Sequence, residues 1–163
     1  MAKKTITLML YMSELIYDVQ NKSYLTGRSR SNGQNHEEVA NMQANDDDEN
    51  ANQIARSIGN AFGTLKSKLS EYIEESGTTA TNKLISTNTN LQLSLIMPSN
   101  YNQSTVETIS AATHQYLVNS ALADWFTITD KNDASDYVTL AGANLEQLRE
   151  AINKRVRPVR SNP

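Results

Sequence analysis

The chain has 163 residues, and its 15 Lys and Arg against 18 Asp and Glu give a net charge of −3, which argues against a protein whose whole surface binds nucleic acid. Hydrophobic residues make up 38% and no apolar run approaches the roughly 18 residues of a membrane span, so neither a disordered nor a membrane protein fits. Cysteine is absent, which excludes disulfides, thiol nucleophiles and thiolate metal sites. We therefore expect one domain over residues 1–163, with an ordered core of about residues 5–155 and no contact with a membrane.

Two segments alternate between apolar and polar residues, the period of a half-buried strand: Thr5–Tyr11 and Leu91–Met97. The basic N-terminus superficially resembles a signal peptide, but its apolar residues alternate with Thr, so we interpret it as a strand. Pro98 ends the second strand because it cannot donate to a ladder. An isolated pair is marginal alone, so this minor antiparallel strand pair must pack on helices or join a neighbour's sheet.

The first half of the chain carries one weak and one strong helical pattern. Apolar residues from Ser13 to Tyr24 follow a loose helical spacing, with Ser13 as the expected N-cap, and Gly27–Asn35 is a polar connection. The next segment, His36–Asn45, contains one helical turn. The strongest helix is expected over Glu49–Glu75, with Gly77 as its stop. Its apolar stripe consists of Ile54, Ile58, Ala61, Phe62, Leu65, Leu69, Tyr72 and Ile73.

We expect this stripe to pack on the two C-terminal helices, since no other surface is large enough to cover it. Gly59 and Gly63 lie inside the helix, where each costs about 1 kcal/mol relative to Ala, so they predict a close helix–helix approach or a local kink. Residues 76–90 form either a loop or an edge segment.

Two further helices are expected over Ser104–Trp125 and from Lys131 or Asn132 to Arg155, the latter capped by Asp130 or Asp133. Their apolar faces contain Val106, Ile109, Thr113, Tyr116, Leu117 and Leu122 in one and Tyr137, Ala141, Leu145, Leu148 and Ile152 in the other. The predicted fold is mainly α, a helical bundle of about three substantial helices with the minor antiparallel strand pair.

No catalytic or metal-binding pattern emerges. The acidic block Asn45–Asn50 lacks the Gly and Glu that a calcium loop needs at its sixth and twelfth positions, so it is a solvated helix start or a cation site without a known motif. His36 and His114, the only imidazoles, have no second His or carboxylate at metal-binding helical spacing; His114 is interpreted as packing rather than catalytic. No phosphate loop, dinucleotide fingerprint or nucleophile elbow occurs. We expect no enzyme activity, no cofactor and no small-molecule substrate.

Two features point to partner binding. Trp125 and Phe126 are either a core plug that closes the angle between two helices or an anchor in a subunit interface. The C-terminal segment 154–163 is the only basic concentration in the chain and is expected to be a flexible tail. The candidate partner-binding residues are Lys154, Arg155, Arg157, Arg160, Trp125 and Phe126.

The second half of the chain resembles structural proteins of tailed bacteriophages, especially phages of gut Bacteroides. A Pro-ended strand leads to a helix with H-x-Y-[IL]-V, a tryptophan corner (ADWF), then D-A-x-x-Y opening a helix that ends in R-x-R-P-x-R. In the first half, LTGRSR, DDDEN and RSIGNAF are similar to the same group, so the resemblance covers most of the chain. The matching positions in the second half are His114, Tyr116, Trp125, Phe126, Asp133, Ala134, Tyr137, Arg155, Arg157, Pro158 and Arg160.

This resemblance implies a non-enzymatic virion protein of the phage neck, a head–tail connector or adaptor that forms a homo-oligomeric ring under the portal. A tail-side or completion protein of the same neck is the other placement. Its implied partners are other copies of itself, the portal and adjacent neck or tail proteins, with contact to packaged DNA in the channel as a lesser role of the tail. Its implied location is the virion neck, and the host cytoplasm during assembly. The rival hypotheses are a small nucleic-acid-binding regulator that uses the basic tail, and an uncharacterised enzyme.

Overall fold

The computed structural model describes residues 2–45, 47–74, 80–83 and 85–160. Over these ranges the protein is mainly helical (64%), with five α-helices and two strands. The elements are β1 (Lys4–Leu10), α1 (Met12–Ser29), α2 (His36–Met42), α3 (Asp48–Lys68), the 3₁₀ turn η1 (Ser70–Tyr72), β2 (Leu91–Met97), the 3₁₀ turn η2 (Gln103–Thr105), α4 (Val106–Thr129) and α5 (Lys131–Ile152). The mainly helical class is confirmed, but about three substantial helices is an undercount, because α1 is an 18-residue helix beside α3, α4 and α5.

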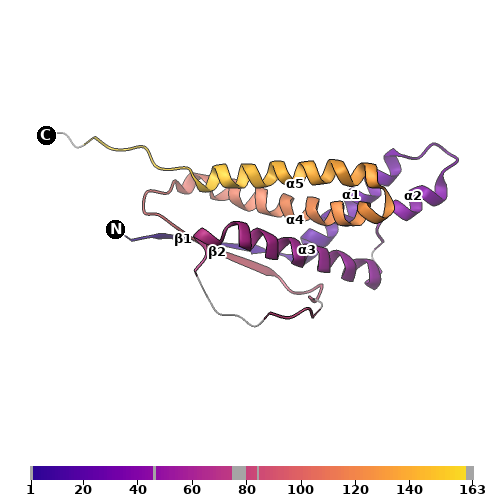
Figure 1. The fold of residues 1–163 in the computed structure, drawn as a ribbon, viewed down its shortest axis with the longest axis horizontal. Helices are drawn as coiled ribbons and strands as arrows, with labels where there is room; N and C mark the ends of the chain where they lie inside the picture. The colour runs from indigo at the N-terminus through magenta and orange to yellow at the C-terminus, as the bar shows by residue number, and fades with distance from the viewer. Residues whose placement is uncertain (1, 46, 75–79, 84, 161–163) are drawn as a thin grey trace.

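The helix α4 is the centre of the molecule. It forms an antiparallel hairpin with α5, while α3 and the strand pair lie on its other side and α1 crosses it (Figure 1). Buried residues occur around most of its circumference rather than on one stripe, because its central turns are nearly free of charge. They are Ile109, Ala112, Thr113, Tyr116, Leu117, Val118, Asn119, Ala121, Leu122, Ala123 and Phe126.

The two strands form an antiparallel ribbon, as expected. Ile6 pairs with Leu95 and Leu8 with Leu93, so the apolar residues of both strands share one face. That face is buried in the common core, whereas Thr5, Thr7 and the other alternate residues of β1 are exposed. The ribbon therefore gains its stability from the helices it covers.

The helix α1 differs from its prediction at both ends. Its N-cap is Tyr11, which makes no side-chain cap, so Ser13 lies inside the helix. It continues to Ser29 through Gly27, which was expected to begin the polar connection. A Cβ at Gly27 would lie 2.7 Å from Gln43 Cγ and 3.2 Å from the Val39 carbonyl oxygen. Glycine is therefore required here for α2 and its following residue to approach α1.

The helix α3 begins as predicted and ends earlier. The Asp47 side chain accepts a hydrogen bond from the Asn50 backbone N–H (2.8 Å), which confirms a helix start within the acidic block. The helix ends at Lys68 and one 3₁₀ turn follows; the predicted stop, Gly77, lies outside the described residues. Its buried stripe packs mainly on α4 and α1 rather than on both C-terminal helices, because α5 lies on the far side of α4 (Figure 1).

The two glycines inside α3 do not mark a helix–helix contact. A Cβ at Gly59 would clash with the side chain of Ile85, which belongs to the segment before β2. A Cβ at Gly63 would have nothing within 4 Å. The close approach predicted for Gly59 therefore exists, but its partner is a connection and not a helix.

The hairpin of α4 and α5 turns at Asp130, whose side chain accepts a hydrogen bond from the Asn132 backbone N–H (3.1 Å) and caps α5. Because α4 continues to Thr129, Trp125 and Phe126 lie inside the helix instead of at its end. Between the two helices, Asn119 Nδ2 donates to Asn144 Oδ1 (2.6 Å).

Candidate partner-binding site

The C-terminal segment has a fixed base. After α5 ends at Ile152, the Asn102 N–H donates to the Lys154 carbonyl oxygen (3.1 Å) and the Val156 N–H donates to the Asn100 carbonyl oxygen (2.8 Å). These bonds form an isolated antiparallel bridge between Tyr101 and Arg155. Tyr101 is completely buried, so the base is held against the core. The segment beginning at Lys154 is thus not a flexible tail from its first residue.

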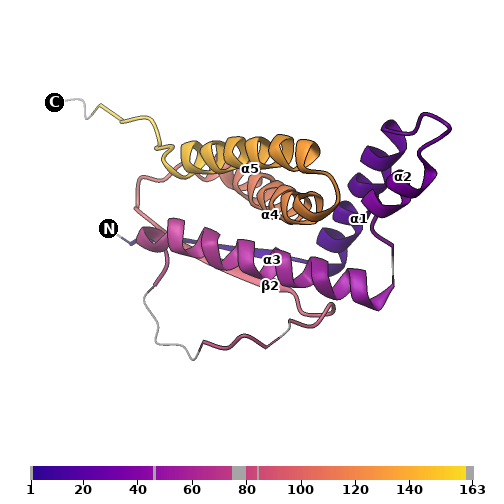
Figure 2. The same ribbon diagram turned by 45° about the vertical axis from the view of Figure 1, so that its right-hand side comes forward.

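Beyond this base the chain is exposed. We call Arg157, Pro158, Val159 and Arg160 the C-terminal arm; all four are exposed and none is helical. Val159 is 93% exposed. Neither arginine forms an ion pair with any described residue, whereas Lys154 pairs with Glu150 (3.4 Å). The arm leaves the body of the molecule at the end where α5 finishes (Figures 1 and 2).

The structure separates Trp125 from Phe126. The Phe126 side chain is fully buried and its ring stacks on Tyr137, with 5.4 Å between the ring centroids. Phe126 is therefore a core residue, the first of the two alternatives for this pair. Trp125 is half-buried, and its Nε1–H donates to the Met42 carbonyl oxygen (2.7 Å). Of this pair, Trp125 is the side chain that reaches the surface.

Trp125 forms one wall of a surface pocket with a volume of 140 Å³. The lining comes from α2, α3 and α4 and is mostly apolar, with Asp124 and Ile128 exposed at its edge. We call it the Trp125 pocket. Its lining residues are Asn41, Gln53, Ile54, Ser57, Ala121, Asp124, Trp125, Ile128 and Thr129.

Acidic residues occur at the helix starts on the same end of the molecule as this pocket (Figure 2). The first turns of α2 and α3 contribute two carboxylates each, and the residues that cap α3 and α5 add two more. We call this region the acidic end; it consists of Glu37, Glu38, Asp47, Asp48, Glu49, Asp124 and Asp130. At the other end of the same helices, α3 finishes with Lys66 and Lys68 and α5 leads into the arm. Both ends also carry the opposite charge: Arg30 and Lys131 lie at the acidic end, and Glu146 and Glu150 lie in the last turns of α5.

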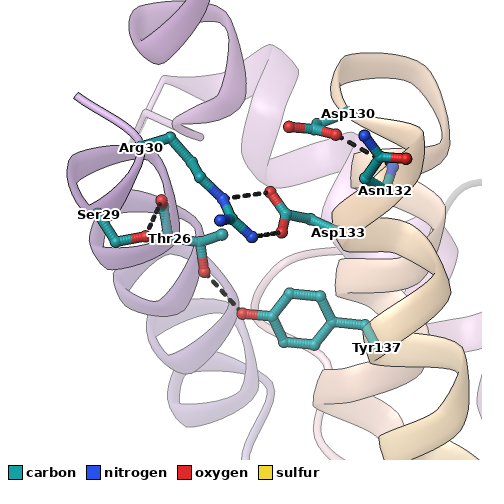
Figure 3. A network of polar contacts seen from close by, with 7 residues as sticks. All are labelled: Thr26, Ser29, Arg30, Asp130, Asn132, Asp133 and Tyr137. Atoms are coloured by element: carbon teal, nitrogen blue, oxygen red, sulfur yellow. Dashed lines mark hydrogen bonds and ion pairs between the residues drawn. The ribbon is translucent and has the colours of Figure 1, made fainter. Parts of the chain in front are cut away.

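A cluster of polar side chains next to the acidic end joins α1 to α5 and has a structural role. Arg30, just after α1, forms an ion pair with Asp133 in the first turn of α5, and Thr26 Oγ1 lies 2.7 Å from the Tyr137 hydroxyl (Figure 3). The hydrogen bond to Asp133 and its negative charge raise the pKa of the Arg30 guanidinium. Asp133 is 3% exposed, so its carboxylate depends on this partner. The LTGRSR and D-A-x-x-Y motifs thus contact each other and join α1 to α5.

The two histidines occupy unlike positions. His114 Nε2 on α4 lies 2.5 Å from Asp18 Oδ2 on α1, which is a contact between packed helices. His36 is exposed at the start of α2. Over the described ranges, no three or more His, Asp or Glu side chains come together as a metal site would require. Among the helices that the structure describes, none combines the length and apolarity that a membrane-spanning segment needs.

Sequence reasoning identified Trp125 and the arm arginines but missed the pocket and the acidic end. The pocket could not be found from local patterns, because its walls come from three helices distant in sequence. Glu37, Glu38 and the acidic start of α3 were visible in the sequence, yet only the fold shows that α2 and α3 line one pocket together with Asp124. No protein-family model, curated protein or solved structure matches this chain.

Proposed function

We propose that this protein is a non-enzymatic structural subunit of a homo-oligomeric ring in the neck of a tailed bacteriophage, between the portal and the tail. The observation that carries the proposal is the C-terminal arm, which is basic, exposed and attached to the body by a fixed base. The resemblance of the sequence motifs to phage structural proteins supplies the biological setting.

An arm of this kind suits assembly. Its base is already ordered by two backbone hydrogen bonds, so only the few residues from Arg157 onward lose conformational freedom when a partner binds. Arginine side chains form bidentate pairs with carboxylates, which gives such a contact direction as well as strength. The arm therefore suits recognition of an acidic protein surface better than of an apolar one.

The strand ribbon is a second means of assembly. Within the described residues, β1 and β2 pair only with each other, so each strand has an outer edge with unpaired backbone groups. Such edges accept a strand from another chain by main-chain hydrogen bonding. A ring subunit that adds its strands to a neighbour's sheet would use these edges.

The test uses a phage whose genome encodes this chain. We expect the protein in purified virions by mass spectrometry and at the neck by immunogold electron microscopy. A phage lacking the gene should accumulate DNA-filled heads without tails, and complementation with a copy that lacks residues 157–163 should fail to restore them. A matched copy carrying Glu146→Arg, an exposed residue of α5 outside the arm, should complement fully. Absence of the protein from virions would refute the proposal.

The rival hypothesis is a regulator that binds nucleic acid through the basic segment. Only two arginines extend beyond the fixed base within the described arm, so few phosphates could be neutralised and the dependence of affinity on salt would be shallow. Fluorescence anisotropy with a labelled DNA duplex at 50 and 200 mM salt distinguishes the two hypotheses. Tight binding that falls by orders of magnitude between these salt concentrations would favour the regulator.

A further inference from the structure

We infer that the C-terminal arm of one copy binds in the Trp125 pocket at the acidic end of the next copy, so that identical subunits join head to tail. This inference rests on the proposed function, because it names the partner that the arm contacts in the assembly. It brings together two exposed features for which the described residues supply no partner.

The arm cannot reach the pocket of its own chain. The pocket lies near the start of α3, at Ile54, and α3 runs on for about 20 Å to Lys68, at the end where the arm departs. The four residues of the arm span about 13 Å when extended, and they point away from the body (Figure 1). A contact between the described arm and the pocket is therefore intermolecular.

The charges of the two surfaces are complementary. The arm carries Arg157 and Arg160, neither of which pairs with a described residue of its own chain. Asp124 at the edge of the pocket is exposed and likewise forms no ion pair with any residue in the described ranges. The first turns of α2 and α3 contribute further carboxylates at the same end of the molecule. A guanidinium at this edge could pair with Asp124 and also lie against the Trp125 ring.

The pocket also fits the apolar residue between the two arginines. Val159 is 93% exposed, which leaves an aliphatic side chain without cover in the isolated chain. The pocket has a volume of 140 Å³ and a mostly apolar lining, and an apolar cavity of about 150 Å³ is large enough for benzene. A valine side chain is smaller than that. Pro158 restricts the backbone before Val159, which lowers the cost of holding the arm extended.

A contact between two different surfaces of the same chain is heterologous. Each copy then offers one arm and one pocket, and repetition closes into a ring if the rotation between copies allows it, or continues as a filament if it does not.

A charge exchange tests the inference with the full-length chain. The first variant, Asp124→Arg, reverses the pocket edge, and the second, Arg157→Asp with Arg160→Asp, reverses the arm. All three positions are exposed, so circular dichroism and thermal melting should remain those of the wild type. The matched control is Glu146→Arg, the same charge reversal at a side chain that is 75% exposed and outside both surfaces.

Sedimentation velocity should show concentration-dependent oligomers for the wild type and the control, and a loss of at least tenfold in association constant for each variant alone. Mixing the two variants should restore oligomers, because each variant's arm then meets a pocket of opposite charge. Val159→Asp should weaken association in the same way, and mixing it with the pocket variant should restore dimers only, because the wild-type arm of the pocket variant then meets the wild-type pocket of the Val159 variant. Wild-type oligomers that persist in both variants would overturn the inference and leave the proposed function intact, with assembly through another surface. If the wild type stays monomeric but neck assembly still requires the arm, the inference is also overturned, and the arm binds a different protein.

Discussion

Leu65 tests whether α3 holds the core as the structure indicates. Its side chain is completely buried and is the last buried residue of the stripe that α3 turns towards α4 and α1. Leu65→Ala removes three heavy atoms from this interface and leaves a cavity, because close-packed neighbours relax only partly. We expect a loss of about 3–4 kcal/mol in the free energy of unfolding, which is a large fraction of the 5–15 kcal/mol typical of a domain. The stronger variant, Leu65→Asp, should unfold the chain because it buries an unpaired charge.

The assay is urea denaturation followed by circular dichroism at 222 nm, with the slope of the transition checked against that of the wild type. In a chain of this size each kcal/mol lowers the melting temperature by about 2–4 °C, so Leu65→Ala should melt about 10 °C lower. The matched control is Thr64→Ala, the preceding and exposed residue of the same helix, which should change stability by less than about 0.5 kcal/mol. If Leu65→Ala costs less than about 1 kcal/mol, or Leu65→Asp keeps the native spectrum and melting temperature, then α3 is not part of the core and the packing described above is wrong.

Three further predictions concern the arm, the long helix and salt. A chain that ends before Arg157 should keep the wild-type melting temperature. A chain that ends before Lys154 should lose about 1–3 kcal/mol in the free energy of unfolding, because two backbone hydrogen bonds of the base are removed. Thermal denaturation of both truncations checks this. Gly63→Ala should raise the free energy of unfolding by about 0.5–1 kcal/mol, since its Cβ meets no atom within 4 Å. Gly59→Ala should raise it by less, because the Ile85 side chain must move. Urea titration compares the two variants, and an equal gain in stability would contradict the contact between Gly59 and Ile85. Self-association through the arm should weaken steadily as sodium chloride rises from 50 to 500 mM in sedimentation velocity, because exposed charges are screened, and an unchanged association constant would argue against an ionic contact.

The strand pair was predictable because its signal is local and explicit. Residues of β2 alternate without interruption from Leu91 to Met97, and Pro98 marks the end, so the predicted and observed bounds agree. The start of α3 was also close, since the helix begins at Asp48, one residue before the predicted Glu49, and Asp47 supplies the capping carboxylate. In both cases a few neighbouring residues carry the whole signal.

The helix α1 shows why weaker signals mislead. Its buried side includes Ser23 and Gly27, whereas Tyr17 and Tyr24 are exposed. Ser23 is accommodated because its hydroxyl donates to the Gln20 carbonyl oxygen and accepts the Ala44 N–H. A period of apolar residues cannot reveal a helix whose contact surface is partly small and polar, so the predicted helix ended at Tyr24, five residues before the end of α1.

The end of α4 was misplaced for a different reason. Trp125 and Phe126 were expected to close the helix, yet it continues through two threonines whose hydroxyls donate back to carbonyl oxygens four residues earlier. These bonds satisfy the two hydroxyls inside the helix, so Thr127 and Thr129 are accommodated there although their helix propensity is weak. The base of the C-terminal segment was equally hidden, because it depends on backbone pairing with Asn100–Asn102, about fifty residues earlier in the chain.

The motif residues that suggested a phage protein fall into two physical classes, and this division bears on how function can be tested. Asp133, Tyr137 and His114 face other helices and hold α1 against α4 and α5, so their replacement should lower stability before it affects any partner. Arg157 and Arg160 support nothing described within the chain, so their replacement should leave stability unchanged and alter only association. Replacing the first class should change stability first, and replacing the second class should change association alone. A variant that loses assembly but keeps the wild-type melting temperature therefore assigns that loss to the arm itself.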